Sequence, residues 1–421
     1  MLNSVTKILK PRELWGLRII AVMTGCALPI QIMGRASIVV PLIVATLGFL
    51  TLPDKDWYFK RVSEAARGPF GVMLLITFLL WLPGVYYSVS PALTLMTLVR
   101  PFIFMGIVSL LWAVLVVNKF LADLALRTMV LASLGAVIIA IIIDTSLPEL
   151  YWLLHFEGWR SYPIGGALKP FSSLAVLIIP VLFWASSRLS TAWRLLSIAS
   201  IIGFVMIVWF TYNRATIAGL LVSMVVFAAW WAWTSRYWMI KVAFPIACIA
   251  VIVAVILWLI QTRPQAEYEG HWLFPPWLID LERQVIWNFA YEIFQQNFWL
   301  GMGANTINFA PGANDIIPFR NSDLHMIPSH PHNWVLEIAA ETGVLGLMSL
   351  LVMIGYTVLQ HFKSLILHDN VPYLAAICVA IGYWSSGLFN FSFWSAWWQM
   401  SFLLIMALVL SFGHQRKFHP D

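Results

Sequence analysis

Charged residues are scarce in this chain of 421 residues, where Asp, Glu, Lys and Arg make up only 10%. A soluble domain carries charge at roughly 25% of its positions. Apolar residues reach 61% and the mean hydropathy is +0.84. These values exclude a soluble globular protein and a disordered one, and they favour a polytopic membrane protein. The net charge of +6 is spread thinly between apolar segments, so no nucleic-acid partner is expected.

Cysteine is almost absent. Cys26, Cys248 and Cys378 each lie in an apolar run, and no CxxC motif occurs. A disulfide framework and a zinc-thiolate site are therefore excluded, and no cofactor is expected. The chain also lacks an A-x-A cleavage site after its first apolar run and shows no internal repeat. The first run is thus expected to be retained, and the missing repeat disfavours an inverted-repeat transporter.

Long apolar runs are abundant in the chain. A window of about 20 residues, the length needed to cross a bilayer, finds twelve candidate spans. They lie near 14–33, 36–52, 69–89, 100–117, 125–143, 171–187, 194–211, 215–234, 239–260, 333–358, 372–393 and 395–412. The sequence therefore predicts an all-α membrane protein with about 12 transmembrane helices.

The distribution of Lys and Arg predicts the orientation. With both chain ends in the cytoplasm, 17 of the 25 basic residues fall on the cytoplasmic side, as the positive-inside rule requires. The other side then carries two long polar stretches, 144–170 and 261–331. Three parts are expected: helices 1 to 9 with short loops in 1–260, a large periplasmic loop in 261–331, and helices 10 to 12 with a short tail in 332–421.

The large loop is predicted to be partly helical. Asp280 to Asn297 reads as a helix with Asp280 as N-cap. Its apolar residues share one face: Ile286, Phe289 and Ile293. Arg283 would lie in the first turn, where a cation opposes the helix dipole unless an anion binds there. Arg283 is therefore a candidate ligand for phosphate, and pairing with Glu282 or another carboxylate is the alternative.

A histidine-rich string, Ser329-His330-Pro331-His332-Asn333, precedes the tenth span. His332 is expected just above the membrane surface on the outer side. Its ordinary pKa near 6.5 suits a general base that takes a proton from a hydroxyl. A helix from Asn333 would place a set of residues on one face with His332, and its glycines predict a groove for a helix or a lipid chain. The set is Leu336, Ala339, Gly343 and Gly346. The alternative is a histidine that only anchors the interface.

Arg214 lies at the outer turn between the seventh and eighth spans, where most such residues are interfacial anchors.

Four side chains near the tenth span are candidate ligands for a zinc ion: His325, His330, His332 and Asp323. The spacing of these side chains matches no zinc signature, so no metal is expected.

These residues resemble the bacterial O-antigen ligases and the wider superfamily of O-antigen ligases and polymerases. The pattern H-[NSQ]-x9-G-x-x-[GTY] is matched by His332, Asn333, Gly343 and Gly346. The context agrees: Trp-Leu-Gly-Met-Gly about thirty residues upstream and Leu-Glu-Ile-Ala-Ala-Glu-Thr-Gly downstream. The likeness is most specific over about 205–350.

The resemblance implies a GT-C-like, inverting, metal-independent glycosyltransferase of the bacterial inner membrane. The donor would be an undecaprenyl-diphosphate-linked polysaccharide and the acceptor the lipid A core, on the periplasmic face. Two arginines and one histidine essential in the family correspond to Arg214, Arg283 and His332. Their neighbours Tyr212, His330 and Asn333 are predicted to contact substrate together with the two arginines. The Thr-Tyr-Asn string before Arg214 departs from the more usual Ser-Arg-Gly/Ala string.

Three alternatives stay open. An O-antigen polymerase would use the same chemistry with a lipid-linked glycan as acceptor. A glycan-to-protein transferase is related but often carries extra C-terminal sequence. A transporter or flippase would place ionisable residues at mid-membrane, whereas nearly all Lys and Arg here lie at span ends or in loops.

Overall fold

The computed structural model describes residues 11–53, 55–156, 164–262, 273–275, 277–317, 325–368 and 371–418. Within these residues the protein is helical, and the one strand-like pairing is an isolated bridge between Ile316 and His325. Eight helices are long and apolar enough to cross a membrane. The predicted class, an all-α multi-pass membrane protein, is therefore confirmed.

Eleven of the twelve predicted spans fall on one helix or on two consecutive helical segments, and the eleventh, 372–393, is helical only to Ser386. In chain order these are α1 (Pro11–Cys26), α2 (Val39–Leu50), α4 (Pro69–Trp81) with α5 (Pro83–Tyr87), α6 (Pro91–Val117), α7 (Lys119–Thr145), α10 (Lys169–Ser173) with α11 (Ala175–Arg188), α12 (Thr191–Phe210), α13 (Arg214–Thr234), α14 (Trp238–Thr262), α16 (Trp334–His368), α17 (Val371–Ser386) and α18 (Ala396–Phe418). Shorter elements connect them: η2 (Pro29–Met33), η3 (Arg35–Ile38), α3 (Lys55–Ala66), α8 (Glu149–Leu154), α9 (Ile164–Ala167), α15 (Leu281–Gln296) and η4 (Ile307–Phe309).

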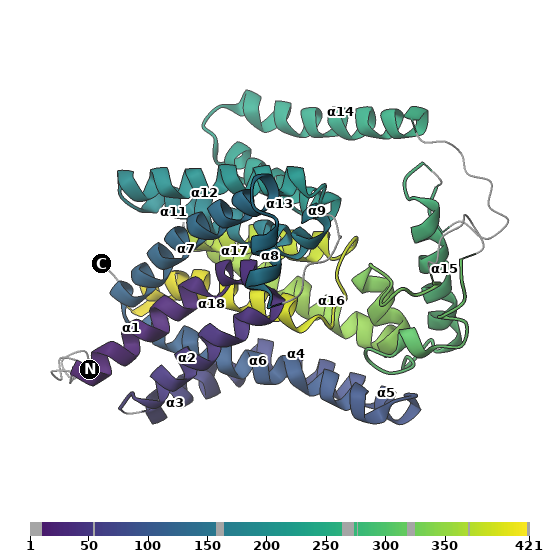
Figure 1. Ribbon diagram of the computed structural model, residues 1–421, viewed down its shortest axis with the longest axis horizontal. Coiled ribbons are helices and arrows are strands. Elements are labelled where there is room, and N and C mark those ends of the chain that lie inside the picture. The colour runs from purple at the N-terminus through teal and green to yellow at the C-terminus, as the bar shows by residue number, and fades with distance from the viewer. Residues whose placement is uncertain are drawn as a thin grey trace.

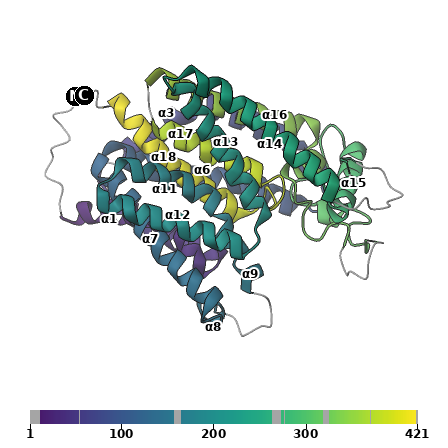
Figure 2. The same cartoon turned by 90° about the horizontal axis from the view of Figure 1, so that it is seen from above.

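The long helices form one bundle, with the beginning of α1 and the end of α18 at the same end (Figures 1 and 2). Helices α8, α9 and α15 lie at the opposite end (Figure 2). The core lies around α7, α11 and α18, and α11 is almost completely buried from Ala175 to Ile178. Helix α14 lies at the edge of the bundle and buries no residue (Figure 1). A helix that is apolar all round and unburied is suited to contact with lipid.

Several boundaries differ from the prediction. The eleventh span was expected to reach residue 393, but α17 ends at Ser386 and 387–393, which include Asn390, form a loop. The tenth was expected to end at residue 358, but α16 continues to His368. The first span was expected to continue to residue 33, but α1 ends at Cys26 and a separate 3-10 helix follows. The fourth span was expected to begin at Arg100, but α6 begins at Pro91, so Arg100 lies inside the helix. The Arg100 guanidinium donates a hydrogen bond to the carbonyl oxygen of Trp394. A basic side chain within a span is tolerated here because a backbone carbonyl accepts from it.

The glycine groove predicted below His332 is wrong, because the chain itself fills it. Gly343 has φ +67 and breaks α16, so no single helical face runs from His332 to Gly346. The segment 298–303 packs into the break: Val344 N–H donates to the Phe298 carbonyl at 2.7 Å, and Gly303 N–H donates to the Glu341 carbonyl at 3.0 Å. A Cβ on Gly343 would lie 2.3 Å from the Trp299 carbonyl oxygen. Glycine is therefore required at 343 for its positive φ and for this backbone contact.

The predicted orientation can be tested by labelling. In a variant without the native cysteines, Asp315→Cys should react with an impermeant thiol reagent in intact cells whose outer membrane is permeabilised. Lys60→Cys should not react, because α3 belongs to the basic loops placed in the cytoplasm. Both side chains are exposed, so accessibility within the fold does not explain a difference. Labelling of Lys60→Cys alone, or of both, would contradict the orientation.

Candidate functional site

The histidine string lies immediately before α16 in a strained backbone conformation. His332 has φ +57, a region that non-glycine residues rarely adopt and that is often found at functional sites. Asn333 follows as the helix cap: its Oδ1 accepts from the N–H groups of Val335 at 3.0 Å and Leu336 at 3.3 Å. The cap holds the first turn of α16, so the His332 ring is presented at a fixed helix end.

The carbonyl oxygen of Asn390 joins the two histidines. His330 Nε2 and His332 Nδ1 each lie 2.9 Å from it, and the two rings are 4.2 Å apart. A carbonyl oxygen only accepts, so both nitrogens carry protons. In neutral His332 the proton on Nδ1 leaves Nε2 with its lone pair. This is the protonation that a general base needs.

Helix α15 brings Arg283 to the same place. Asp280 caps the helix by accepting from the Arg283 N–H at 3.1 Å, as predicted. One turn further, the buried Trp287 donates through Nε1 to the Pro331 carbonyl at 2.9 Å. Because these two residues share a helix face, fixing Trp287 against the histidine string also fixes Arg283 beside it. The Arg283 guanidinium donates to the Phe389 carbonyl at 3.3 Å and lies over the Phe389 ring.

Arg283 keeps the capacity to bind an anion. Its Nε lies 3.8 Å from Asp280 Oδ2, at the long limit of an ion pair, and its side chain is 32% exposed. Pairing with a nearby carboxylate, the alternative role of Arg283 that the sequence suggests, is therefore limited to one weak contact with Asp280. The guanidinium lies close enough to His332 for its positive charge to lower the pKa of that ring.

Burial and the arginine both hold the histidines in the neutral form. Burial lowers the pKa of His330 to about 4, and the neighbouring His332 acts in the same direction. Burial also lowers the pKa of His332, and the positive charge of Arg283 adds to that effect; the hydrogen bond to Asn390 opposes it. Because His330 is neutral, its Nδ1 accepts from the Ser329 hydroxyl at 2.8 Å.

Two buried glutamates hold the loops around the histidines, and neither is among the site residues predicted from the sequence. Glu337 accepts from the Ser392 hydroxyl at 2.5 Å and from the Phe393 N–H at 2.6 Å. Glu341 accepts from the Thr306 and Ile307 N–H groups, each at 2.9 Å. Glu337 thus fixes the loop that carries Asn390. The available signal was two ionisable residues four apart in an apolar span, which is unusual enough to indicate a role.

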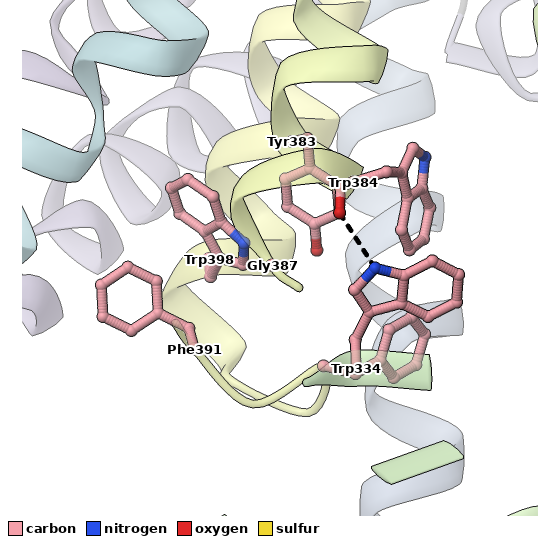
Figure 3. A pocket seen from close by; sticks show the side chains of 7 residues that line it. Trp334, Tyr383, Trp384, Gly387, Phe391 and Trp398 are labelled. Carbon is pink, nitrogen blue, oxygen red and sulfur yellow. Dashed lines mark hydrogen bonds between the residues drawn. The ribbon is translucent and has the colours of Figure 1, made fainter. Parts of the chain in front are cut away.

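An aromatic layer from α16, α17, α18 and the Asn390 loop itself packs around that loop (Figure 3). Trp334 Nε1 donates to the Trp384 carbonyl at 2.9 Å, the dashed line in Figure 3. The cavity among these rings measures only about 10 Å³, which is room for one water at most. Its lining is Trp334, Tyr383, Trp384, Gly387, Phe391, Phe393 and Trp398. This layer is a packed support and not a substrate cavity.

Arg214 reaches the site only through its neighbour. Asn213 caps α13 and donates through Nδ2 to the Ser173 hydroxyl at 2.8 Å. The Asn390 side-chain amide lies 3.4 Å from the same Ser173 oxygen. The Arg214 side chain makes no ion pair within the described residues and is exposed, as is Tyr212 at 77% with φ +48. The structure brings His330, His332 and Arg283 to one loop, on the carbonyls of Asn390 and Phe389. The roles of these three residues toward substrate stay predictions, as do those of Arg214, Tyr212 and Asn333.

The histidines considered for a metal site do not converge. His325 Nδ1 bonds to the Asn314 carbonyl at 2.7 Å, away from the Asn390 contact that the other two share. Asp323 lies outside the described residues. In the part of the chain that the structure describes, no three His, Cys, Asp or Glu side chains gather as possible ligands.

The fold and the site define a multi-pass helical membrane protein with a histidine–arginine site at one end of its bundle. Residues 198–351 match the family model described as O-antigen ligase, and this segment contains Arg214, Arg283 and His332. The chain is 31% identical over 132 residues to the Rickettsia prowazekii (strain Madrid E) protein named "Putative polysaccharide ligase RP358". It is 30% identical over 132 residues to the protein of the same kind from Rickettsia typhi (strain ATCC VR-144 / Wilmington). These matches support an O-antigen ligase family member and confirm the resemblance predicted from the sequence.

The likeness to these relatives is local. Each of the two alignments covers 30% of this chain and 31% of the relative. The chain therefore matches less than a third of the length of these relatives, and the family segment ends before the loop that carries Asn390.

Replacing Glu337 should destabilise the site loop. Glu337→Ala leaves the Ser392 and Phe393 donors without an acceptor, which we expect to cost about 2–4 kcal/mol. The melting temperature of the purified protein should fall by several degrees, whereas Glu292→Ala, at an exposed glutamate of α15, should leave it unchanged. Equal melting temperatures for Glu337→Ala and wild type would show that Glu337 does not hold the loop.

Proposed function

We propose that this protein is an O-antigen ligase that transfers a polysaccharide from undecaprenyl diphosphate to the lipid A core, on the periplasmic face of the inner membrane. The observation that carries the proposal is that His332 and Arg283, which both lie in the segment that matches the O-antigen ligase family, bond to the adjacent carbonyl oxygens of Asn390 and Phe389. A base beside a cation suits the displacement of a diphosphate by a hydroxyl.

In the proposed reaction His332 Nε2 takes the proton of the acceptor hydroxyl. The acceptor oxygen attacks the anomeric carbon and forms the new glycosidic bond, while the bond from that carbon to the diphosphate oxygen breaks. A single displacement inverts the anomeric configuration. The lipid diphosphate leaves with the electron pair and with more negative charge than it had in the donor. The driving energy comes from the donor, so no nucleotide is needed.

Arg283, with Arg214, is proposed to stabilise the charge on the leaving diphosphate. The partly exposed guanidinium of Arg283 and its position in the first turn of α15 both favour a phosphate ligand. Without a metal, these side chains supply the positive charge in the transition state. Tyr212, His330 and Asn333 are proposed to line the substrate path beside them.

Deleting the gene tests the proposed function. Surface polysaccharide should disappear from the lipid A core, and lipid-linked polymer of normal length should accumulate. Restoring the wild-type gene should reverse both effects, and a His332→Ala gene should reverse neither. Accumulation of single lipid-linked repeat units would instead indicate an O-antigen polymerase. Unchanged surface polysaccharide would contradict both activities.

Substitutions should separate the base from the phosphate ligands. His332→Ala should slow transfer by about 10²–10⁴-fold and leave donor binding nearly unchanged, because a base acts on the acceptor. Arg283→Ala and Arg214→Ala should weaken binding of the diphosphate donor as well as slow transfer, and lysine should not rescue a bidentate contact. His325→Ala is the matched control. If His332→Ala lost donor affinity while the arginine variants kept it, the assignment would be wrong.

The pH dependence should report the lowered pKa of His332. The neutral ring is the active form, so kcat/KM should fall as the pH drops through that pKa. Because burial and Arg283 lower the pKa, the acidic inflection should lie below pH 6.5. Arg283→Gln removes one cause of the lowering, so its residual activity should show an inflection at higher pH. An inflection above pH 7 in the wild type would contradict a neutral buried base.

Chelation tests the metal-independent mechanism. EDTA should leave transfer by the purified protein unchanged, because the proposed mechanism assigns the positive charge to arginines. Magnesium, manganese and zinc should each fail to raise the rate of the EDTA-treated protein. Loss of activity in EDTA that one divalent ion restores would overturn this part of the proposal.

A further inference from the structure

A polar cavity lies at the end of the helix bundle opposite to the two histidines. It lies between the beginning of α7 and the turn that joins α11 to α12, and it measures about 280 Å³. Its lining is Lys119, Asp123, Arg127, Arg188, Leu189 and Ser190. The three residues from α7 recur every four positions and therefore share one helix face. The cavity thus gathers three cations and one carboxylate from two separate parts of the chain.

Two of the three cations have no acidic partner. Asp123 pairs with Arg188 at 3.1 Å, with both side chains partly buried. Lys119 and Arg127 make no ion pair with any carboxylate in the described ranges. Lys119 is also the first residue of α7, where a cation opposes the helix dipole. The cavity therefore holds a surplus positive charge that local pairing does not explain.

Aromatic rings contact two of the three cations, and Lys119 and Arg127 are exposed. The Arg127 guanidinium lies 5.5 Å from the centre of the Trp193 ring, and that of Arg188 lies 4.6 Å from the Phe412 ring. Ser190 begins α12 without its hydroxyl capping the helix, so an acceptor is missing at that helix end as well. A single anion in the cavity would provide an acceptor for Lys119 and Arg127, the two cations that pair with no carboxylate in the described ranges.

We propose that this cavity binds the phosphate of an anionic phospholipid. Helices α7 and α12 are both candidate membrane spans, so their ends lie at the depth of the lipid headgroups. Trp193 beside the cavity suits the same interface. A basic pocket between transmembrane helices at that depth is complementary to a phosphodiester whose acyl chains stay in the bilayer. The site would lie in the leaflet opposite the His332 site and does not depend on the proposed function.

Lipid binding to the full-length purified protein tests the proposal. Native mass spectrometry would follow retention of phosphatidylglycerol and of phosphatidylcholine from mixed micelles. The test variant is Lys119→Gln/Arg127→Gln. The matched control is Lys60→Gln/Arg67→Gln, which removes one Lys and one Arg from the same predicted side but outside the cavity. Unchanged melting temperatures would show that both variants fold.

The wild type should retain phosphatidylglycerol in preference to phosphatidylcholine. The cavity variant should bind phosphatidylglycerol about 30-fold more weakly, and the control should match the wild type. Inorganic phosphate at millimolar concentration should not displace the lipid. Full displacement by phosphate, with no preference for the anionic lipid, would indicate a free-anion site and overturn the assignment to a lipid. Equal losses in both variants, or none in either, would show that these cations are only dispersed topology anchors.

Discussion

The candidate site depends on one backbone oxygen. The Asn390 carbonyl accepts from His330 Nε2 and His332 Nδ1, each at 2.9 Å, and these two bonds decide which ring nitrogen of each histidine carries a proton. The oxygen can do this only if its loop is fixed. Glu337 fixes the loop through Ser392 and Phe393. The base that we propose, His332, is therefore oriented through Glu337 by way of the loop between them.

A second constraint follows from the packing of α15. The bond from Trp287 to the Pro331 carbonyl attaches this helix to the histidine string, and Arg283 lies one turn away on the same helix. Placing the arginine beside His332 has an electrostatic consequence, because its charge helps to lower the pKa of the ring. An anion bound to Arg283 would offset that charge and make His332 a stronger base. In this arrangement donor binding would itself prepare the base for the acceptor.

Local signals in the sequence were sufficient to predict the membrane helices, the helix that carries Arg283 and the importance of the histidine string. Eleven of the twelve apolar runs fall on helices, because a bilayer demands continuous apolar length and that length can be read from the sequence. The run 372–393 is helical only to Ser386, because apolar side chains also line the Asn390 loop that follows. The helix with Asp280 as its cap was predicted in the same way, from an N-cap residue and an apolar face. His332 and Arg283 were both predicted from the sequence, and the structure places them on adjacent carbonyls of one loop, while their roles stay predictions.

The contacts that were missed are long-range or belong to the backbone. Asn390 acts through its carbonyl, which every residue has, so no side-chain pattern marks it. Gly343 was read as part of a helical face because glycine is common in membrane helices, whereas its positive φ depends on the backbone of Trp299 packing against it. Arg100 was placed at a span end because its acceptor, the Trp394 carbonyl, lies 294 residues away.

The tautomer of His332 tests this account most directly. Nitrogen-15 NMR of the histidine-labelled protein in lipid, with His332→Gln for assignment, would show which ring nitrogen carries the proton at neutral pH. We expect a neutral ring protonated at Nδ1 with an unprotonated Nε2, because the Asn390 carbonyl can only accept. A His332 protonated at Nε2, or at both nitrogens, would contradict the claim that Asn390 sets up the general base.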